Sequence, residues 1–131
     1  MIILIDDNPI DTFIQTKALE LGGYRGRIEA FRSAEKALDY FQGISTSAIE
    51  ADSFILLDIR IPSMNGFEFL DALQRLDKEV VSTFPVYFLS SSLDLEDRQR
   101  ANTYPNVVGF LEKPLTRHVV AGLPGIRKAA S

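Results

Sequence analysis

Three aspartates that follow two apolar runs are the residues most able to do chemistry in this sequence. Asp6 and Asp7 come directly after residues 2–5, and Asp58 comes directly after residues 54–57. Carboxylates about 4 Å apart repel each other by roughly 4 kcal/mol at an effective dielectric constant of about 20, so a cation is expected among them. Oxygen ligands without a neighbouring histidine or cysteine favour Mg²⁺. The sequence therefore predicts a Mg²⁺ site beside an ionised Asp58.

Two other polar residues follow later apolar runs and extend this prediction. Ser90 follows residues 86–89, and Lys113 follows residues 107–111 after one intervening residue. A carboxylate beside a lysine and Mg²⁺ can attack phosphorus and form an aspartyl phosphate. The metal, the ammonium and a hydroxyl can stabilise charge on the transferring oxygens. Each residue alone also has a structural explanation, as a helix cap, a turn residue or a solvated side chain, so the phosphoryl chemistry depends on their convergence.

The order of elements predicts that these residues converge. Strand patterns alternate with helical patterns along the whole chain, and the expected strands cover residues 2–5, 27–31, 54–57, 86–89 and 107–111. This alternation predicts an α/β fold, in which one parallel five-stranded sheet carries helices on both faces. Ligands of such sheets bind outside the carboxyl ends of the strands. If the first and third strands are neighbours, the three aspartates meet there.

The expected helices have recognisable caps and apolar faces. Asn8 and Pro9 can begin the first helix, and Gly22-Gly23 can end it. Its apolar residues recur at helical spacing and predict the packed face: Ile10, Phe13, Ile14, Ala18 and Leu21. Ser33 can cap a second helix, Gly66 opens a third, and weaker helical patterns run from Leu93 to Asn102 and from Leu115.

Composition limits the class of protein. The chain has 131 residues and a formal net charge of −4, which fits one domain and argues against direct binding of nucleic acid or an anionic membrane. It contains no cysteine, so disulfides, thiolate zinc sites and cysteine nucleophiles are excluded. The apolar run at the N-terminus is too short for a signal peptide or a membrane span. We expect a cytoplasmic domain.

Four sequence markers carry a resemblance to a known family. They are Ile-Asp-Asp-Asn at 5–8, the segment from Leu57 to Gly66, the segment 85–91 around Ser90, and Phe-Leu-Glu-Lys-Pro at 110–114. Together they resemble the receiver domains of two-component response regulators, most closely the stand-alone, chemotaxis-type ones, from about Ile2 to about Val120. The resemblance implies the flavodoxin-like strand order 2-1-3-4-5. It also implies a receiver domain over residues 1–121 and a short tail over 122–131.

The resemblance implies roles for the acidic residues. Asp58 matches the phosphoryl acceptor, which is also a ligand of Mg²⁺. Asp7 matches a direct Mg²⁺ ligand, and Asp6 matches a partner that acts largely through water. The backbone carbonyl of Arg60 matches the remaining protein ligand of the metal.

The resemblance also implies a switch. Ser90 matches the hydroxyl that moves to the phosphoryl group, and Lys113 matches the lysine that pairs with that group. In the family the peptide bond after this lysine is cis, so the resemblance implies a cis bond between Lys113 and Pro114. Phe110 matches the aromatic residue whose rotamer reports the state of the site. It lacks the hydroxyl of a tyrosine, so we expect it to prefer an inward position. We also hypothesise that the Arg60 side chain reaches across the site and alters hydrolysis of the phosphoryl group.

The implied function is that of a signalling receiver, whose only catalysis is self-limited phosphotransfer and autodephosphorylation. The donor would be a sensor histidine kinase or a histidine phosphotransfer protein, because His118, the only histidine, is expected to be a solvated side chain. The downstream partner would be another protein. No effector segment is recognised in the sequence.

Three alternatives are compatible with parts of the pattern. A receiver-like interaction module could keep the fold without being phosphorylated, although it would not need all of these residues. A Mg²⁺-dependent phosphatase with an Asp nucleophile typically has a second Asp two residues later, where this chain has Arg60, which cannot act as an acid near neutral pH. Flavodoxin-like cofactor binding needs a phosphate-cradling loop, and Asp6-Asp7 would repel a phosphate there.

Overall fold

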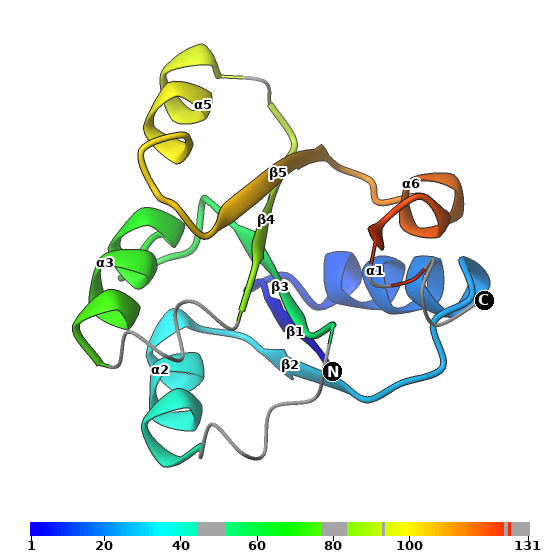
Figure 1. Ribbon diagram of the computed structural model, residues 1–131, viewed down its shortest axis with the longest axis horizontal. Coiled ribbons are helices and arrows are strands. Elements are labelled where there is room, and N and C mark those ends of the chain that lie inside the picture. Colours follow the sequence, from blue (N-terminus) through cyan, green and yellow to red (C-terminus); the bar gives the residue numbers. More distant parts are fainter. Residues whose placement is uncertain (45–51, 77–83, 93, 125, 127–131) are drawn as a thin grey trace.

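A parallel sheet forms the centre of the protein (Figure 1). The computed structural model describes residues 1–44, 52–76, 84–92, 94–124 and 126. In this part of the chain, five parallel strands lie in the order β2-β1-β3-β4-β5, which confirms the predicted fold and strand order. The strands are β1 (Ile2–Ile5), β2 (Ile28–Phe31), β3 (Phe54–Asp58), β4 (Val86–Ser90) and β5 (Val107–Glu112).

The two central strands explain the continuous apolar runs. Every residue of β1 and β3 is buried, because helices cover both faces of the sheet at this point. The two strands are hydrogen-bonded neighbours, and Ile5 pairs with Leu57 in their register. Asp6 and Asp58 are the next residues after this pair. The pairing therefore brings their carboxylates to the same edge of the sheet.

The helices form two layers, as Figure 1 shows. On one face, α1 (Pro9–Leu21) and α6 (Arg117–Ala121) cover a core that includes Ile2 and Leu4. On the other face, α2 (Ala34–Gly43) and α3 (Gly66–Leu76) cover a larger core that is rich in phenylalanine. The helix α5 (Leu95–Ala101) contributes Ala101 to this second core. Within the described residues, no helix is both long enough and apolar enough to cross a membrane.

The N-terminal caps agree with the sequence prediction. The Asn8 side chain accepts hydrogen bonds from the backbone N–H groups of Ile10 and Asp11, and the Ser33 side chain accepts one from Lys36. These bonds satisfy donors that have no partner within the helix. Asp94 caps α5, which therefore begins at Leu95; the residue from which we expected this helix to start, Leu93, lies outside the described part of the chain.

The predicted apolar face of α1 is wrong except at Ala18. The buried residues of this helix are Gln15, Ala18 and Leu19, whereas Phe13 is 62% exposed and Leu21 is 68% exposed. The helix has apolar residues on more than one side, so its periodicity does not select one face. The small Ala18 and the neighbouring Leu19 pack against the sheet, and this rotation also turns the polar Gln15 inward.

The expected loop and the expected tail are described only in part. The small and polar residues from Gly43 to Ser53 predict a loop or a frayed helix end, and residues 45–51 of this stretch lie outside the described part of the chain. The same is true of residues 125 and 127–131 of the expected tail. Within that tail, Leu123 and Ile126 are buried in the core beneath α1 and α6.

Candidate functional site

An acidic cluster lies where β1 and β3 end. One carboxylate oxygen from each of Asp6, Asp7 and Asp58 lies within 4.8 Å of the other two. Asp6 and Asp58 are buried, at 1% and 8% exposure, and Asp7 is exposed. The donor atoms are all carboxylate oxygens at a separation that one cation can span, which fits the preference of Mg²⁺ for oxygen ligands and retained water. The residues present therefore fit the predicted metal.

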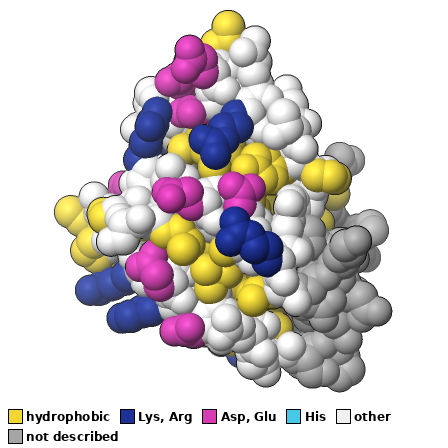
Figure 2. Space-filling view, turned by 90° about the vertical axis from the view of Figure 1, so that its left-hand side faces the viewer, with side chains coloured by type: hydrophobic (Ala, Val, Ile, Leu, Met, Phe, Trp, Pro, Cys, Tyr) yellow, Lys and Arg dark blue, Asp and Glu magenta, His cyan; other side chains and the backbone are white. Residues whose placement is uncertain are grey.

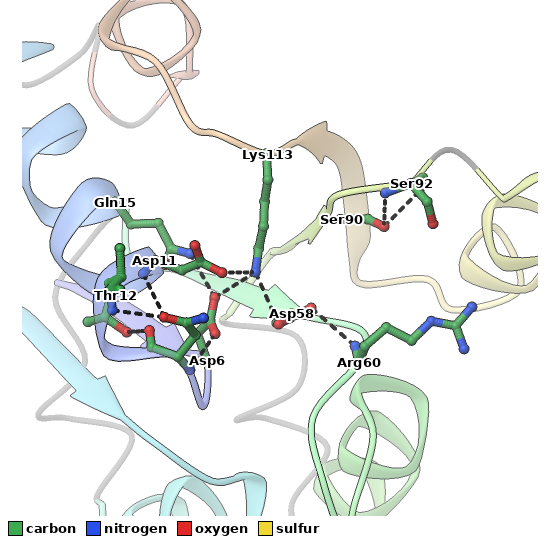
Figure 3. Close-up of polar contacts among 11 residues, drawn as sticks. Asp6, Asp11, Thr12, Gln15, Asp58, Arg60, Ser90, Ser92 and Lys113 are labelled. Carbon is green, nitrogen blue, oxygen red and sulfur yellow. Dashed lines mark hydrogen bonds and ion pairs between the residues drawn. The ribbon is translucent and has the colours of Figure 1, made fainter.

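Lys113 joins this cluster from the end of β5 (Figure 3). Its Nζ donates hydrogen bonds to Asp6 Oδ2 at 2.8 Å, Asp11 Oδ2 at 3.0 Å and Asp58 Oδ2 at 3.1 Å. The three donors of the ammonium are thus all used. Burial alone would lower the pKa of Lys113, but its carboxylate partners raise that pKa above its ordinary value. Lys113 remains a cation, and the peptide bond that follows it, to Pro114, is cis.

Burial also affects the pKa of Asp58. Its Oδ1 accepts a hydrogen bond from the backbone N–H of Arg60 at 3.1 Å, and its Oδ2 accepts the bond from Lys113. Burial raises the pKa of Asp58 above 3.8, and the positive charge of Lys113 opposes this rise. A buried carboxylate with one close cation gains from a second cation, which is the role predicted for Mg²⁺.

The raised pKa of Asp58 predicts how stability depends on pH in the metal-free protein. A carboxyl whose pKa is raised by folding stabilises the fold when it is protonated, and this contribution is lost as the pH rises through the folded-state pKa. Asp58→Asn is neutral at every pH. We expect it to raise the free energy of unfolding at neutral pH. Urea denaturation in EDTA would measure this difference, which should shrink as the pH approaches 3.8. A difference that is constant with pH would contradict the shift.

A close approach behind Asp58 requires glycine at the start of α3. A Cβ atom on Gly66 would lie 2.9 Å from the backbone oxygen of Asp58 and 2.9 Å from the Phe88 ring. The Gly66 N–H also donates to the Ile59 carbonyl at 2.9 Å. These contacts hold the turn after β3 against the sheet. They therefore set the position of the Asp58 backbone and of the Arg60 N–H that bonds to its carboxylate.

Ser90 lies at the end of β4, but its hydroxyl is hydrogen-bonded to the backbone of Ser92 rather than to the acidic cluster. Its Oγ donates to the Ser92 carbonyl at 2.7 Å, and the Ser92 N–H donates back to that Oγ at 3.2 Å (Figure 3). Ser90 is 5% exposed. The backbone is tied to the site as well, because the Lys113 N–H donates to the Ser90 carbonyl at 2.8 Å. Donation from Ser90 Oγ to a phosphoryl oxygen would require its bond to the Ser92 carbonyl to break.

Phe110 is half-buried on β5. The centroid of its ring lies 6.0 Å from the centroid of the Phe88 ring. On the side of α5, the Arg98 guanidinium lies 5.5 Å from the centroid of the Phe110 ring. A hollow of about 240 Å³ opens beside it, lined by Arg98, Ala101, Asn102, Val107, Val108, Gly109 and Phe110. The ring therefore lies between the core and the surface between α5 and β5, with space next to it.

The Arg60 side chain does not reach across the site as we hypothesised from the sequence. It points away from Asp58 in Figure 3, and its guanidinium donates to Asp97 of α5 at 2.9 Å. A second carboxylate, that of Asp94, lies 3.7 Å away. The Arg60 side chain is 68% exposed. The ion pair satisfies the guanidinium at a distance from the acidic cluster.

This position predicts a small effect of Arg60 on the phosphoryl lifetime. Because the guanidinium is engaged in an exposed ion pair, we expect Arg60→Ala to change the half-life of a phosphoryl group on Asp58 by less than about twofold. Intact-mass spectrometry after removal of the phosphodonor would follow the decay. A much larger change would restore the hypothesis that Arg60 reaches the phosphoryl group.

Two residues of α1 belong to the site but were not recognised from the sequence. Asp11 is the third partner of Lys113, and Gln15 Nε2 donates to Asp6 Oδ2 at 2.9 Å. Gln15 is 2% exposed. The two residues are four positions apart and so lie on the same side of the helix. A polar pair at this spacing, beginning four residues after Asp7, is the signal that could have revealed them.

Comparisons with known proteins agree with this geometry. Residues 2–121 match the family described as the response regulator receiver domain. The probable methanogenesis regulatory protein FilR2 of Methanothrix harundinacea is 33% identical over 88% of this chain and 73% of its own length. The sensor protein EvgS of Escherichia coli is 26% identical over 91% of this chain but only 9% of its own length.

Solved structures support the same family. A two-component response regulator from Cytophaga hutchinsonii has a TM-score of 0.84 at 26% identity, and the match covers 98% of this chain and 95% of that one. The family comprises signalling modules rather than classical enzymes. The residues that match the family include all five strands and the acidic cluster. This chain belongs to the response regulator receiver domain family of two-component signalling.

Proposed function

We propose that Asp58 accepts a phosphoryl group from a phosphohistidine on a sensor histidine kinase or a histidine phosphotransfer protein in the cytoplasm. The observation that carries this proposal is the Lys113 ammonium, which lies 3.1 Å from Asp58 within the acidic cluster. In this proposal residues 1–121 are the receiver domain and residues 122–131 are a tail. Asp6, Asp7, Asp58 and the carbonyl of Arg60 would hold Mg²⁺.

The transfer uses few groups of the protein. An oxygen of the Asp58 carboxylate attacks phosphorus, the bond from phosphorus to the donor imidazole nitrogen breaks, and the electron pair leaves with the imidazole. Lys113 orients the carboxylate and stabilises charge on the transferring oxygens. Bound Mg²⁺ would neutralise more of this charge. Later attack by water on phosphorus would release phosphate and restore the carboxylate.

The surface around the site is suited to a protein donor. On α1, next to Lys113, the exposed side chains include Ile10, Phe13 and Ile14. Ile14 also lines a small hollow together with Asp11 and Lys113. Exposed apolar groups grouped beside a polar site are typical of protein-binding surfaces. The similarity to a segment of a sensor protein supports a partner from the same signalling system.

The output is proposed to be a docking surface formed by α5, β5 and α6. Phosphorylation would draw Ser90 Oγ from Ser92 to a phosphoryl oxygen and would make room for the Phe110 ring to move inward. Arg98 and the hollow beside Phe110 belong to the surface that would change. On the face that carries α3 and α5, acidic, basic and apolar side chains are mixed (Figure 2). Such a surface suits a downstream protein.

Beryllofluoride, which mimics a phosphoryl group, provides a test of this switch. With Mg²⁺, we expect it to shift the amide NMR signals of Ser90 and Phe110 as well as those around Asp58. An Asp58→Ala variant should show none of these shifts. Binding that leaves Ser90 and Phe110 unchanged would contradict the switch, and no binding would favour an unphosphorylated interaction module.

The phosphatase alternative needs a separate measurement. A receiver should incorporate at most one phosphoryl group per chain and should not turn over p-nitrophenyl phosphate catalytically. Arg60 stands where such a phosphatase would carry its acid, and its guanidinium is paired with Asp97. Sustained release of p-nitrophenol by the wild type, lost in Asp58→Ala, would show that the protein is a phosphatase and would contradict the receiver function.

A further inference from the structure

Asp11 of α1 shares its lysine with the proposed phosphoryl acceptor. Its Oδ2 lies 3.0 Å from Lys113 Nζ, and Asp58 Oδ2 lies 3.1 Å from the same nitrogen. The two carboxylate oxygens are therefore no more than about 6 Å apart. The Lys113 side chain is 13% exposed and the Asp11 side chain is 34% exposed, so water screens this group of charges only in part.

We propose that Asp11 is a positioning residue that limits how tightly the site holds a phosphoryl group, because it withholds part of the Lys113 ammonium from that group. This inference rests on the proposed function. A phosphoryl group on Asp58 brings additional negative charge and needs a donor from Lys113. Asp11 competes for that donor, and its own charge opposes the incoming group.

The balance of effects decides the expected direction. Two unit charges about 6 Å apart interact strongly enough, at an effective dielectric constant of about 20, to change an affinity by more than tenfold. The competing effect is the loss of an acceptor that orients Lys113, and it is small in Asp11→Asn because the asparagine oxygen can still accept. Asp6 also continues to hold the ammonium at 2.8 Å. Removal of the charge should therefore favour the phosphoryl group.

A simpler role for Asp11 makes different predictions. An acidic residue in the first turn of a helix interacts favourably with the helix dipole, and stabilisation of α1 could be the only effect of Asp11. In that case, Asp11→Asn would lower the melting temperature slightly and leave phosphoryl binding unchanged. The two roles can be distinguished by the affinity of Asp11→Asn for a phosphoryl mimic, because loss of a helix-dipole effect would leave that affinity unchanged.

Titration with beryllofluoride at saturating Mg²⁺ separates these roles. We expect Asp11→Asn to bind beryllofluoride about tenfold more tightly than the wild type, since about half of the charge effect is lost to screening. Asp11→Glu, which keeps the charge, should stay near the wild type. The matched control is Glu20→Gln, which removes one exposed charge from the same helix, where Glu20 pairs with Lys17 at 3.4 Å. It should change the affinity by less than about twofold.

A second readout needs no metal. In the metal-free protein, the ¹⁵N-detected signal of Lys113 Nζ should shift in Asp11→Asn and stay in place in Glu20→Gln. If the wild type binds beryllofluoride but Asp11→Asn binds it equally or more weakly, the role of Asp11 is overturned and the proposed function stands. If the wild type does not bind beryllofluoride at all, both are overturned.

Discussion

Replacing Lys113 with alanine should lower the rate at which Asp58 is phosphorylated by about 100-fold, which is the effect of removing one preorganised charge donor from an active site. Lys113 is the cation that contacts Asp58 and Asp6 directly, at 3.1 and 2.8 Å. The measurement is the initial rate of adduct formation with acetyl phosphate at saturating Mg²⁺, followed by intact-mass spectrometry. A matched control is Lys17→Ala, which removes an exposed lysine from α1 and should leave the rate unchanged.

The same replacement should also destabilise the metal-free protein. Without Lys113, the buried carboxylates of Asp6 and Asp58 lose their common cation, and we expect the free energy of unfolding to fall by about 1 to 3 kcal/mol. Mg²⁺ should restore part of this loss because it supplies another cation. Urea denaturation with and without Mg²⁺ would show both effects. A Lys113→Ala variant that is phosphorylated at the wild-type rate would remove Lys113 from the proposed mechanism.

Loss of a metal ligand is the second large effect. Asp7 is exposed at the acidic cluster, and among the described residues no side chain donates a hydrogen bond to its carboxylate, so its oxygens remain available to a metal. We expect Asp7→Asn to weaken Mg²⁺ binding by at least about tenfold. Isothermal titration calorimetry suits this measurement because the chain has no tryptophan to report binding by fluorescence.

The control for this experiment removes a carboxylate elsewhere. Asp39 is exposed on α2, and Asp39→Asn changes the net charge by the same amount as Asp7→Asn. It should bind Mg²⁺ as the wild type does. Equal affinity of Asp7→Asn and the wild type would show that the metal is held without Asp7, contrary to the proposed ligand set.

The sequence was sufficient to predict the elements whose environment allows only one interpretation. Residues 2–5 and 54–57 are apolar at every position because β1 and β3 are buried on both faces. The polar residues at their ends could then be assigned to one edge of a parallel sheet. The central part of the site, formed by Asp6, Asp58 and Lys113, follows from this arrangement and from the position of β5.

The sequence was insufficient where several orientations were equally compatible with the residues. The helix α1 has apolar residues around much of its circumference, so its pattern did not reveal that Gln15 and Leu19 are buried while Phe13 is exposed. The contact between Asp11 and Lys113 depends on that rotation. For the same reason, the contacts of Asp11 and Gln15 with the site could not be predicted.

The orientation of long and polar side chains was also beyond the sequence. Nothing in the residue pattern indicated that the Arg60 guanidinium would pair with Asp97 on α5, because the two residues are 37 positions apart. The hydrogen bonds between Ser90 and Ser92 are local, but they compete with the role predicted for Ser90 and were not anticipated. The first contact depends on the folded arrangement, and the second depends on which of several possible partners the Ser90 hydroxyl takes.

The central claim is that Asp58 accepts one phosphoryl group in a metal-dependent reaction, and intact-mass spectrometry after incubation with acetyl phosphate and Mg²⁺ tests it most directly. The wild type should gain a single phosphoryl adduct. Asp58→Ala should gain none, and neither should the wild type in EDTA. An adduct of equal yield on folded Asp58→Ala, or no adduct on the folded wild type under any of these conditions, would contradict the claim.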